Sequence, residues 1–71
     1  MRRFDSAALY SALDKQRISR GLTWTEVARQ TRVSLATIKR TESGGRMEVD
    51  GMLALVHWLG VPVEAFVRDV T

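Results

Sequence analysis

Residue types that commonly build metal and disulfide sites are scarce in this chain of 71 residues, which has no cysteine and one histidine, His57. Without cysteine the chain cannot form disulfides or thiolate sites, and a single histidine cannot supply a multi-histidine zinc site. We therefore expect no bound metal and no cofactor.

Long apolar runs are also missing from the sequence. A membrane-spanning helix needs about 20 consecutive, mainly apolar residues, and no stretch approaches that length. Residues 1–15 contain two arginines, but Asp5, Tyr10 and Asp14 interrupt their apolar residues, which argues against a signal peptide. We expect no membrane partner and a cytoplasmic location, in the bacterial cytoplasm or nucleoid, with either a bacterial or a phage gene as the source.

Catalytic groups are equally scarce. A hydrolytic site would need a serine or threonine beside His57 in a cleft, but His57 lies in a predicted helix with no framework large enough to form one. A glycine-rich phosphate loop would have to follow a strand, and no strand is predicted. We interpret His57 as a solvated or packed residue and expect that the protein is not an enzyme.

Length and hydrophobic content favour one small helical domain. A chain of 71 residues with 45% hydrophobic residues is sufficient for one core and too short for a second domain. We expect a compact all-α fold over residues 1–71, with its core at about residues 5–68.

Capping residues and helical spacing predict the first helix. Asp5 or Ser6 is suited to cap a helix over residues 6–20, which buries Leu9 and Leu13 at i, i+4 spacing. A glycine directly after this segment ends the helix, because glycine readily adopts the left-handed conformation found there.

Two more helices are predicted in the C-terminal part. One covers residues 49–58, and Pro62 begins a short last helix, since proline is tolerated in a first turn. The longer of the two buries an apolar stripe at steps of three and four residues, consisting of Val49, Met52, Leu53, Val56 and Leu59. With the two helices described next, the sequence predicts five helices and no strand.

The central residues 23–43 predict a corner of two short helices, over residues 24–31 and 35–41, capped by Thr23 and Ser34. Its inward side chains are apolar: Val27, Ala28, Val33 and Ile38. The outward face of the second helix mixes short and cationic side chains, namely Leu35, Ala36, Thr37, Lys39 and Arg40. This pattern is typical of a helix that approaches another surface closely.

Charge is distributed unevenly along the chain. Residues 15–46 contain eight lysines and arginines against two glutamates, a net charge of +6, whereas residues 47–71 contain one arginine against four acidic residues, a net charge of −3. A polyanion partner is the simplest interpretation, because cations placed on phosphates release counterions. The alternative is a solvated basic surface.

Two blocks of sequence carry a resemblance to a known family. The block GLTWTEVARQTRVSLATIKRTESGGR, residues 21–46, is followed by LVHWLGVPVEAF, residues 55–66. From about residue 13 to residue 66 the chain resembles the phage repressor and Cro type of helix-turn-helix domain, the XRE family. The resemblance implies a five-helix, lambda-repressor-like fold whose helix-turn-helix is formed by the second and third helices.

The resemblance also implies which residues contact double-stranded DNA. In the family, the positions of Thr23 and Trp24 lie against the phosphate backbone, although Trp24 is equally well interpreted as a hydrophobic lid on the corner. The start of the second corner helix faces the base edges, and residues past its end return to phosphate. The implied DNA-binding residues are Thr23, Trp24, Ser34, Leu35, Ala36, Thr37, Lys39, Arg40, Ser43 and Arg46.

Three further expectations come from the family. A structural ion pair is common between the positions of Arg17 and Glu42. Arg32 replaces the usual glycine of the turn, so either Arg32 adopts positive φ or the turn differs. The last two helices often form a two-fold dimer, which implies an interface of Trp58, Val63 and Phe66, with the core as the alternative location of Phe66.

These observations together predict a sequence-specific transcriptional regulator of the Cro or repressor kind. It would bind double-stranded DNA as a homodimer, with the helix of residues 35–41 in the major groove. Three alternatives stay open: an antitoxin-type autoregulator, an architectural DNA-binding protein without sequence preference, and a protein-interaction module that uses the same fold.

Overall fold

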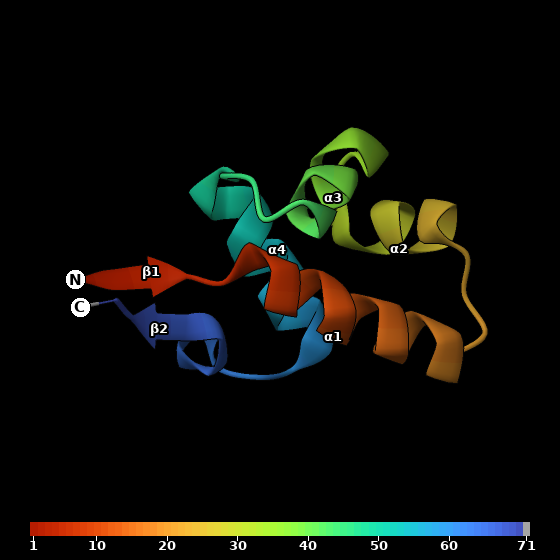
Figure 1. The fold of residues 1–71 in the computed structure, drawn as a ribbon. Helices are drawn as coiled ribbons and strands as arrows, with labels where there is room; N and C mark the ends of the chain where they lie inside the picture. The colour runs from red at the N-terminus through yellow and green to blue at the C-terminus, as the bar shows by residue number, and fades with distance from the viewer. Residues whose placement is uncertain (71) are drawn as a thin grey trace.

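The computed structural model describes residues 1–70, most of which are helical (Figure 1). The described part has four α-helices and one 3₁₀ turn: α1 (Ser6–Ser19), α2 (Trp24–Thr31), α3 (Leu35–Glu42), α4 (Val49–Leu59) and η1 (Val63–Phe66). Two short strands, β1 (Arg2–Phe4) and β2 (Val67–Asp69), pair antiparallel near the two ends of the chain. The prediction of a mainly helical fold is confirmed.

The C-terminal part differs from the prediction of five helices and no strand. After Pro62 the chain forms only the single turn η1, and Val67 then adopts extended backbone angles, φ −91° and ψ 131°. The strand that follows pairs with β1, and the Asp5 N–H donates to the Phe66 carbonyl at 2.6 Å. This pairing gives hydrogen-bond partners to backbone N–H and C=O groups, whereas the last carbonyl groups of a fifth helix would have no partner within the helix.

Helix α1 begins and ends where its capping residues predict. The Asp5 carboxylate accepts a hydrogen bond from the Ala8 N–H at 2.9 Å, which satisfies one of the free donors of the first turn. Gly21 follows the C-terminal end with φ +68°, a conformation that costs glycine little.

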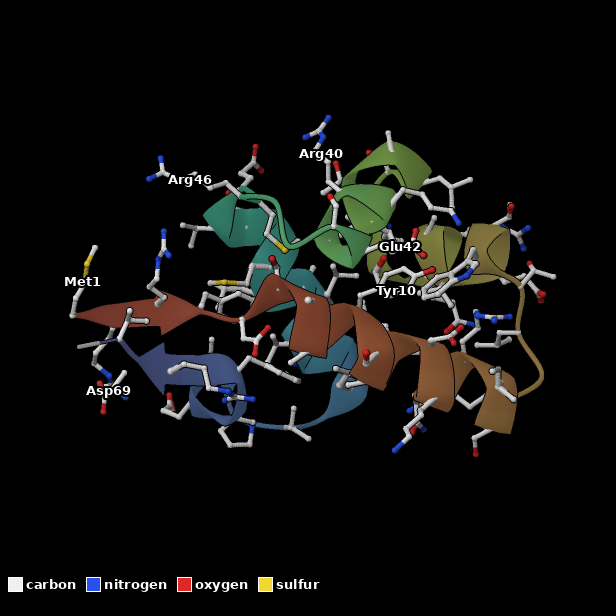
Figure 2. All side chains as sticks on the ribbon, in the orientation of Figure 1. Met1, Tyr10, Arg40, Glu42, Arg46 and Asp69 are labelled. Atoms are coloured by element: carbon white, nitrogen blue, oxygen red, sulfur yellow. The ribbon has the colours of Figure 1, made fainter. Side chains whose placement is uncertain are left out.

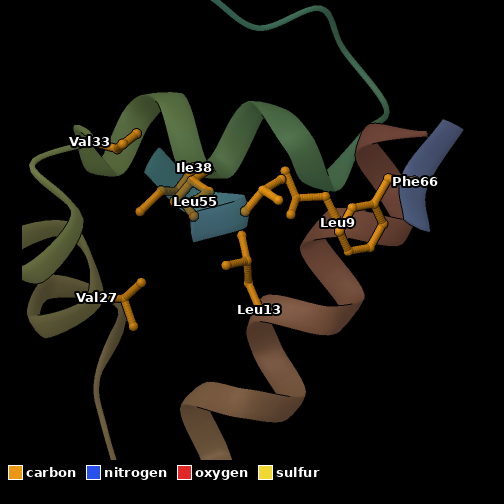
Figure 3. Close-up of a cluster of buried hydrophobic side chains, with 8 residues drawn as sticks. Leu9, Leu13, Val27, Val33, Ile38, Leu55 and Phe66 are labelled. Carbon is orange, nitrogen blue, oxygen red and sulfur yellow. The ribbon is translucent and has the colours of Figure 1, made fainter. Parts of the chain in front are cut away.

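The core lies between α1, α3 and α4, with α2 and η1 covering its sides (Figures 1 and 3). All four α-helices and η1 contribute buried apolar side chains: Leu9, Leu13, Val27, Val33, Ile38, Leu55, Val56 and Phe66. Because Val33 and Ile38 anchor α3 on one side, its opposite side is fixed toward solvent.

The predicted buried stripe of α4 is wrong at two positions. Val49 and Leu53 are 61% and 48% exposed, whereas Leu55 is 0% exposed and Val56 is 4% exposed. Most residues of α4 are apolar, so the sequence pattern alone does not decide which side of the helix faces the core. The buried side of α4 is instead determined by its contacts with α1 and α2.

Candidate nucleic-acid interface

The corner formed by α2 and α3 has the caps that the sequence predicts. Thr23 caps α2, and Ser34 caps α3 by accepting a hydrogen bond from the Thr37 N–H at 3.2 Å. Between the helices, Arg32 adopts the left-handed conformation, φ 60° and ψ 25°. The turn therefore keeps the backbone shape that glycine usually provides, at a cost on the order of 1 kcal/mol for the arginine.

The outward face of α3 carries a continuous exposed surface. Leu35, Ala36, Lys39 and Arg40 are exposed, and their spacing of i, i+1, i+4 and i+5 places them on one side of the helix. Ile38 and Thr41, both 0% exposed, occupy the opposite side. In Figure 2 the Arg40 side chain projects away from the body of the protein. This surface, Leu35, Ala36, Lys39, Arg40 and the adjoining Ser43, is called the α3 face below.

Ser34 and Thr37 take a smaller part in the α3 face than predicted. Their hydroxyl oxygens lie 2.8 Å apart in a mutual hydrogen bond. Thr37 is also partly buried, since the first turn of α4 approaches it: a Cβ atom on Gly51 would lie 3.8 Å from the Thr37 methyl carbon. The two hydroxyls are therefore engaged within the protein.

The N-terminal end of α2 is occupied by one of its own carboxylates. Glu26 accepts hydrogen bonds from the Thr23 N–H at 2.9 Å and from the Thr23 hydroxyl at 3.0 Å, and these bonds lower the pKa of Glu26. A charged carboxylate here takes the donors that a phosphate would use. The predicted phosphate contact of Thr23 would have to displace Glu26.

Trp24 packs on α1 instead of facing outward. Its ring stacks on Tyr10 with centroids 5.0 Å apart and an interplanar angle of 20°, and the Arg17 guanidinium lies 4.8 Å from its ring centroid. The interpretation of Trp24 as a hydrophobic lid therefore fits the structure, and the phosphate-contact interpretation does not.

The predicted ion pair between Arg17 and Glu42 is wrong. Arg17 instead pairs with Asp14, three residues earlier on α1, with Nη2 and Oδ1 2.6 Å apart, and it also donates to the Leu22 carbonyl at 3.1 Å. Glu42 is exposed and makes no ion pair within residues 1–70. A local partner avoids the cost of removing two charges from water at the interface of two helices.

Substitution at Arg17 separates these two arrangements. We expect Arg17→Met to lower the free energy of unfolding by about 1–2 kcal/mol, because partly buried hydrogen bonds to a charged group are lost. Glu42→Gln, the matched change at the predicted partner, should cost about 0.5 kcal/mol or less. Urea unfolding followed by circular dichroism measures both, and equal losses would restore the pair with Glu42.

The residues predicted to form a dimer interface make most of their contacts within the same chain. Phe66 is 7% exposed and its ring lies against Phe4, with centroids 5.9 Å apart, so Phe66 belongs to the core. The Trp58 Nε1–H donates to the Gln30 side chain at 2.9 Å, and the Arg20 guanidinium lies 4.4 Å from the Trp58 ring centroid. Val63 is partly buried against the core.

Acidic residues beside the α3 face were not assigned to the site from sequence. A depression of about 270 Å³ at the start of α3 is lined by Arg32 and Arg40 and also by Glu48 and Asp50. Sequence reasoning placed these carboxylates in a separate acidic half of the chain. The turn that leads into α4 brings them back to α3, where they reduce the local positive potential.

Thr23, Ser34, the α3 face and Arg46 are the parts of the predicted site that stay exposed. Arg46, in the loop between α3 and α4, is exposed and makes no ion pair within residues 1–70. The same residues contain no group of three or more histidine, aspartate or glutamate side chains placed to hold a metal ion. None of the helices described has the length and apolar composition needed to cross a membrane.

Comparisons with protein-family models, curated proteins and solved structures found no match to this chain.

Proposed function

We propose that the protein binds double-stranded DNA sequence-specifically and regulates transcription, with α3 in the major groove. The observation that carries the proposal is the α3 face: Leu35 and Ala36 at the start of the helix, and Lys39 and Arg40 one turn later, are exposed on one side of a capped helix. A major groove admits a helix of this diameter, and the small Ala36 side chain allows close approach.

The chemistry of the α3 face suits a duplex. Arg40 can donate two hydrogen bonds to a guanine, and Leu35 and Ala36 can contact thymine methyl groups. Lys39 and Arg46, at and beyond the end of α3, can neutralise phosphates on the sides of the groove. Because Glu26 occupies the N-terminal end of α2, the proposed contact is restricted to α3 and the following loop, in contrast to the broader site implied by the resemblance.

A protein-interaction module is the second candidate function. Leu35 is 41% exposed and lies on the α3 face, so a polypeptide could cover it in place of a duplex. The neighbouring Lys39 favours DNA, because protein interfaces are depleted of lysine at their centres.

Selection of bound fragments from a random duplex pool tests the proposal directly. A preferred sequence should emerge, and two bound copies should give a palindrome with half-site centres about 10 base pairs apart. A pool without enrichment would refute sequence-specific binding.

The contribution of Arg40 can then be measured on the selected duplex. We expect Arg40→Ala to weaken binding by about 5- to 150-fold, which corresponds to a loss of about 1–3 kcal/mol for a bidentate contact with guanine, and to relax the preference at one base pair. Lys15→Ala, which removes an exposed cation from α1, is the matched control and should leave affinity nearly unchanged. Fluorescence anisotropy measures both variants. If Arg40→Ala weakens all duplexes equally, Arg40 contacts phosphate and the proposed contact with guanine is wrong.

A further inference from the structure

A groove of about 640 Å³ lies between β1 and the loop that joins α3 to α4. Every residue from Met1 to Ser6 lines it, and residues 44–47 form much of its other side. The side chains of successive strand residues point to opposite faces of the strand. Since all residues of β1 line the groove, the groove runs along the edge of β1 and not over one of its faces. Figure 2 shows Met1 and Arg46 at the same end of the molecule.

The edge of β1 in this groove has open backbone groups. On the other edge, the Met1 carbonyl accepts from Val70 N–H at 2.7 Å, Asp5 N–H donates to the Phe66 carbonyl at 2.6 Å, and Arg3 lies opposite Arg68. In an antiparallel pair, positions bonded to the partner alternate with positions whose N–H and C=O point away from it. Arg2 and Phe4 are the alternate positions, so their backbone groups face the open edge. Such an edge is a template for an additional strand.

The groove is strongly cationic. Four arginines and one aspartate line it, a net charge of +3. Arg2 and Arg68 have acidic neighbours, at 3.7 Å from Asp69 and 3.5 Å from Asp5 respectively. Arg3 and Arg46 make no ion pair and no side-chain hydrogen bond within residues 1–70. Two guanidinium groups are thus available to an anionic partner.

The register of the strands adds a second electrostatic feature. Arg3 and Arg68 stand directly opposite each other on one face of the pair. Like charges in this position destabilise a strand pair, and an acidic side chain on a neighbouring strand would relieve the repulsion. The other face of β1 carries Phe4, and the half-buried Met47 and Met52 also line the groove. One side of the groove therefore favours carboxylates, and the other, where Arg2 pairs with Asp69, offers apolar contacts from Phe4, Met47 and Met52.

We propose that this groove binds an extended acidic segment of a partner protein, which pairs with the open edge of β1 as a third strand. The backbone groups of Arg2 and Phe4 would hold the segment, as in other cases of strand addition. Arg3 and Arg46 would select glutamate or aspartate, and Phe4, Met47 and Met52 would contact the apolar residues between the acidic ones.

A labelled peptide of alternating glutamate and valine, about seven residues long, which is a usual strand length, tests the proposal with the whole protein. We expect this peptide to bind, and a lysine and valine peptide of the same length not to bind. A glutamate and valine peptide N-methylated at alternate residues should bind at least about tenfold more weakly, because it loses the donors for the edge of β1. Equal binding of the methylated and unmethylated peptides would overturn the pairing.

Variants of the protein test the charge part of the proposal. Arg3→Ala should weaken peptide binding by about fivefold, whereas Arg29→Ala, which removes an exposed cation of α2, should not change it. Circular dichroism establishes that both variants are folded. Arg40 does not line the groove, so Arg40→Ala should leave peptide affinity unchanged. If Arg3→Ala left peptide binding intact and instead weakened duplex binding, the groove would belong to a DNA interface and the proposal would be wrong.

Discussion

Replacing Leu55 with alanine should lower the free energy of unfolding by about 2–5 kcal/mol. Leu55 is 0% exposed, on the side of α4 that faces the core, so truncation leaves a cavity in the cluster of buried apolar side chains (Figure 3). A domain of this size has a total stability of about 4–10 kcal/mol. The variant should therefore lose a large fraction of its stability, and urea unfolding followed by circular dichroism measures the loss.

Leu53 supplies a matched control on the same helix. It is 48% exposed, so Leu53→Ala makes the same chemical change without opening a cavity, and it should alter stability by about 0.5 kcal/mol or less. The comparison also tests which side of α4 is buried, because the sequence pattern assigns Leu53 to the buried stripe and leaves Leu55 at its flank, either in the core or in an exposed patch. A larger loss for Leu53→Ala would contradict the packing of α4.

Local features of the fold were predictable from sequence because they depend on neighbouring residues. The caps at Asp5, Thr23 and Ser34 each use an acceptor and a donor that lie three residues apart. One local pattern in the sequence, at the start of α2, was not recognised. Thr23 and Glu26 have the spacing of a capping box, which indicates a carboxylate at the start of α2 and argues against a free phosphate site there.

Features that depend on distant residues were not predictable. The partners of β1 lie more than sixty positions away in β2, and each strand has three residues, too few for a periodic pattern. The exposure of Glu42 belongs to the same class, because it depends on how α3 lies relative to α1, whereas the ion pair that Arg17 forms with Asp14 is local and was missed.

The candidate site falls between these two cases. Exposure of Leu35, Ala36 and Arg40 followed from the helical period once Ile38 was assigned to the core. The proximity of Glu48 and Asp50 to α3 did not follow, since it depends on the path of the loop before α4. The number of cations that act together at the site is therefore smaller than the net charge of residues 15–46 suggests.

Duplex binding should weaken steeply as salt concentration rises. Two exposed cations on or after α3, Lys39 and Arg46, are assigned to phosphates, whereas Arg40 is assigned to a guanine. If both neutralise phosphate charge, the logarithm of affinity should fall with the logarithm of salt concentration at a slope of about −1.8 for each bound copy. Between about 50 and 200 mM salt this slope corresponds to a loss of about 12-fold for one copy, and about 150-fold for two copies on one site.

Arg46→Ala tests which cations produce this slope, measured by fluorescence anisotropy over a salt series. Removing one phosphate contact should reduce the magnitude of the slope by about 0.9 for each copy while leaving the preferred sequence unchanged, because phosphate contacts carry no base information. Lys15→Ala, an exposed cation on α1, should leave the slope unchanged. A slope near zero in the unmodified protein would mean that the α3 face does not bind a polyanion, and the exposed Leu35 and Ala36 would then indicate a polypeptide partner.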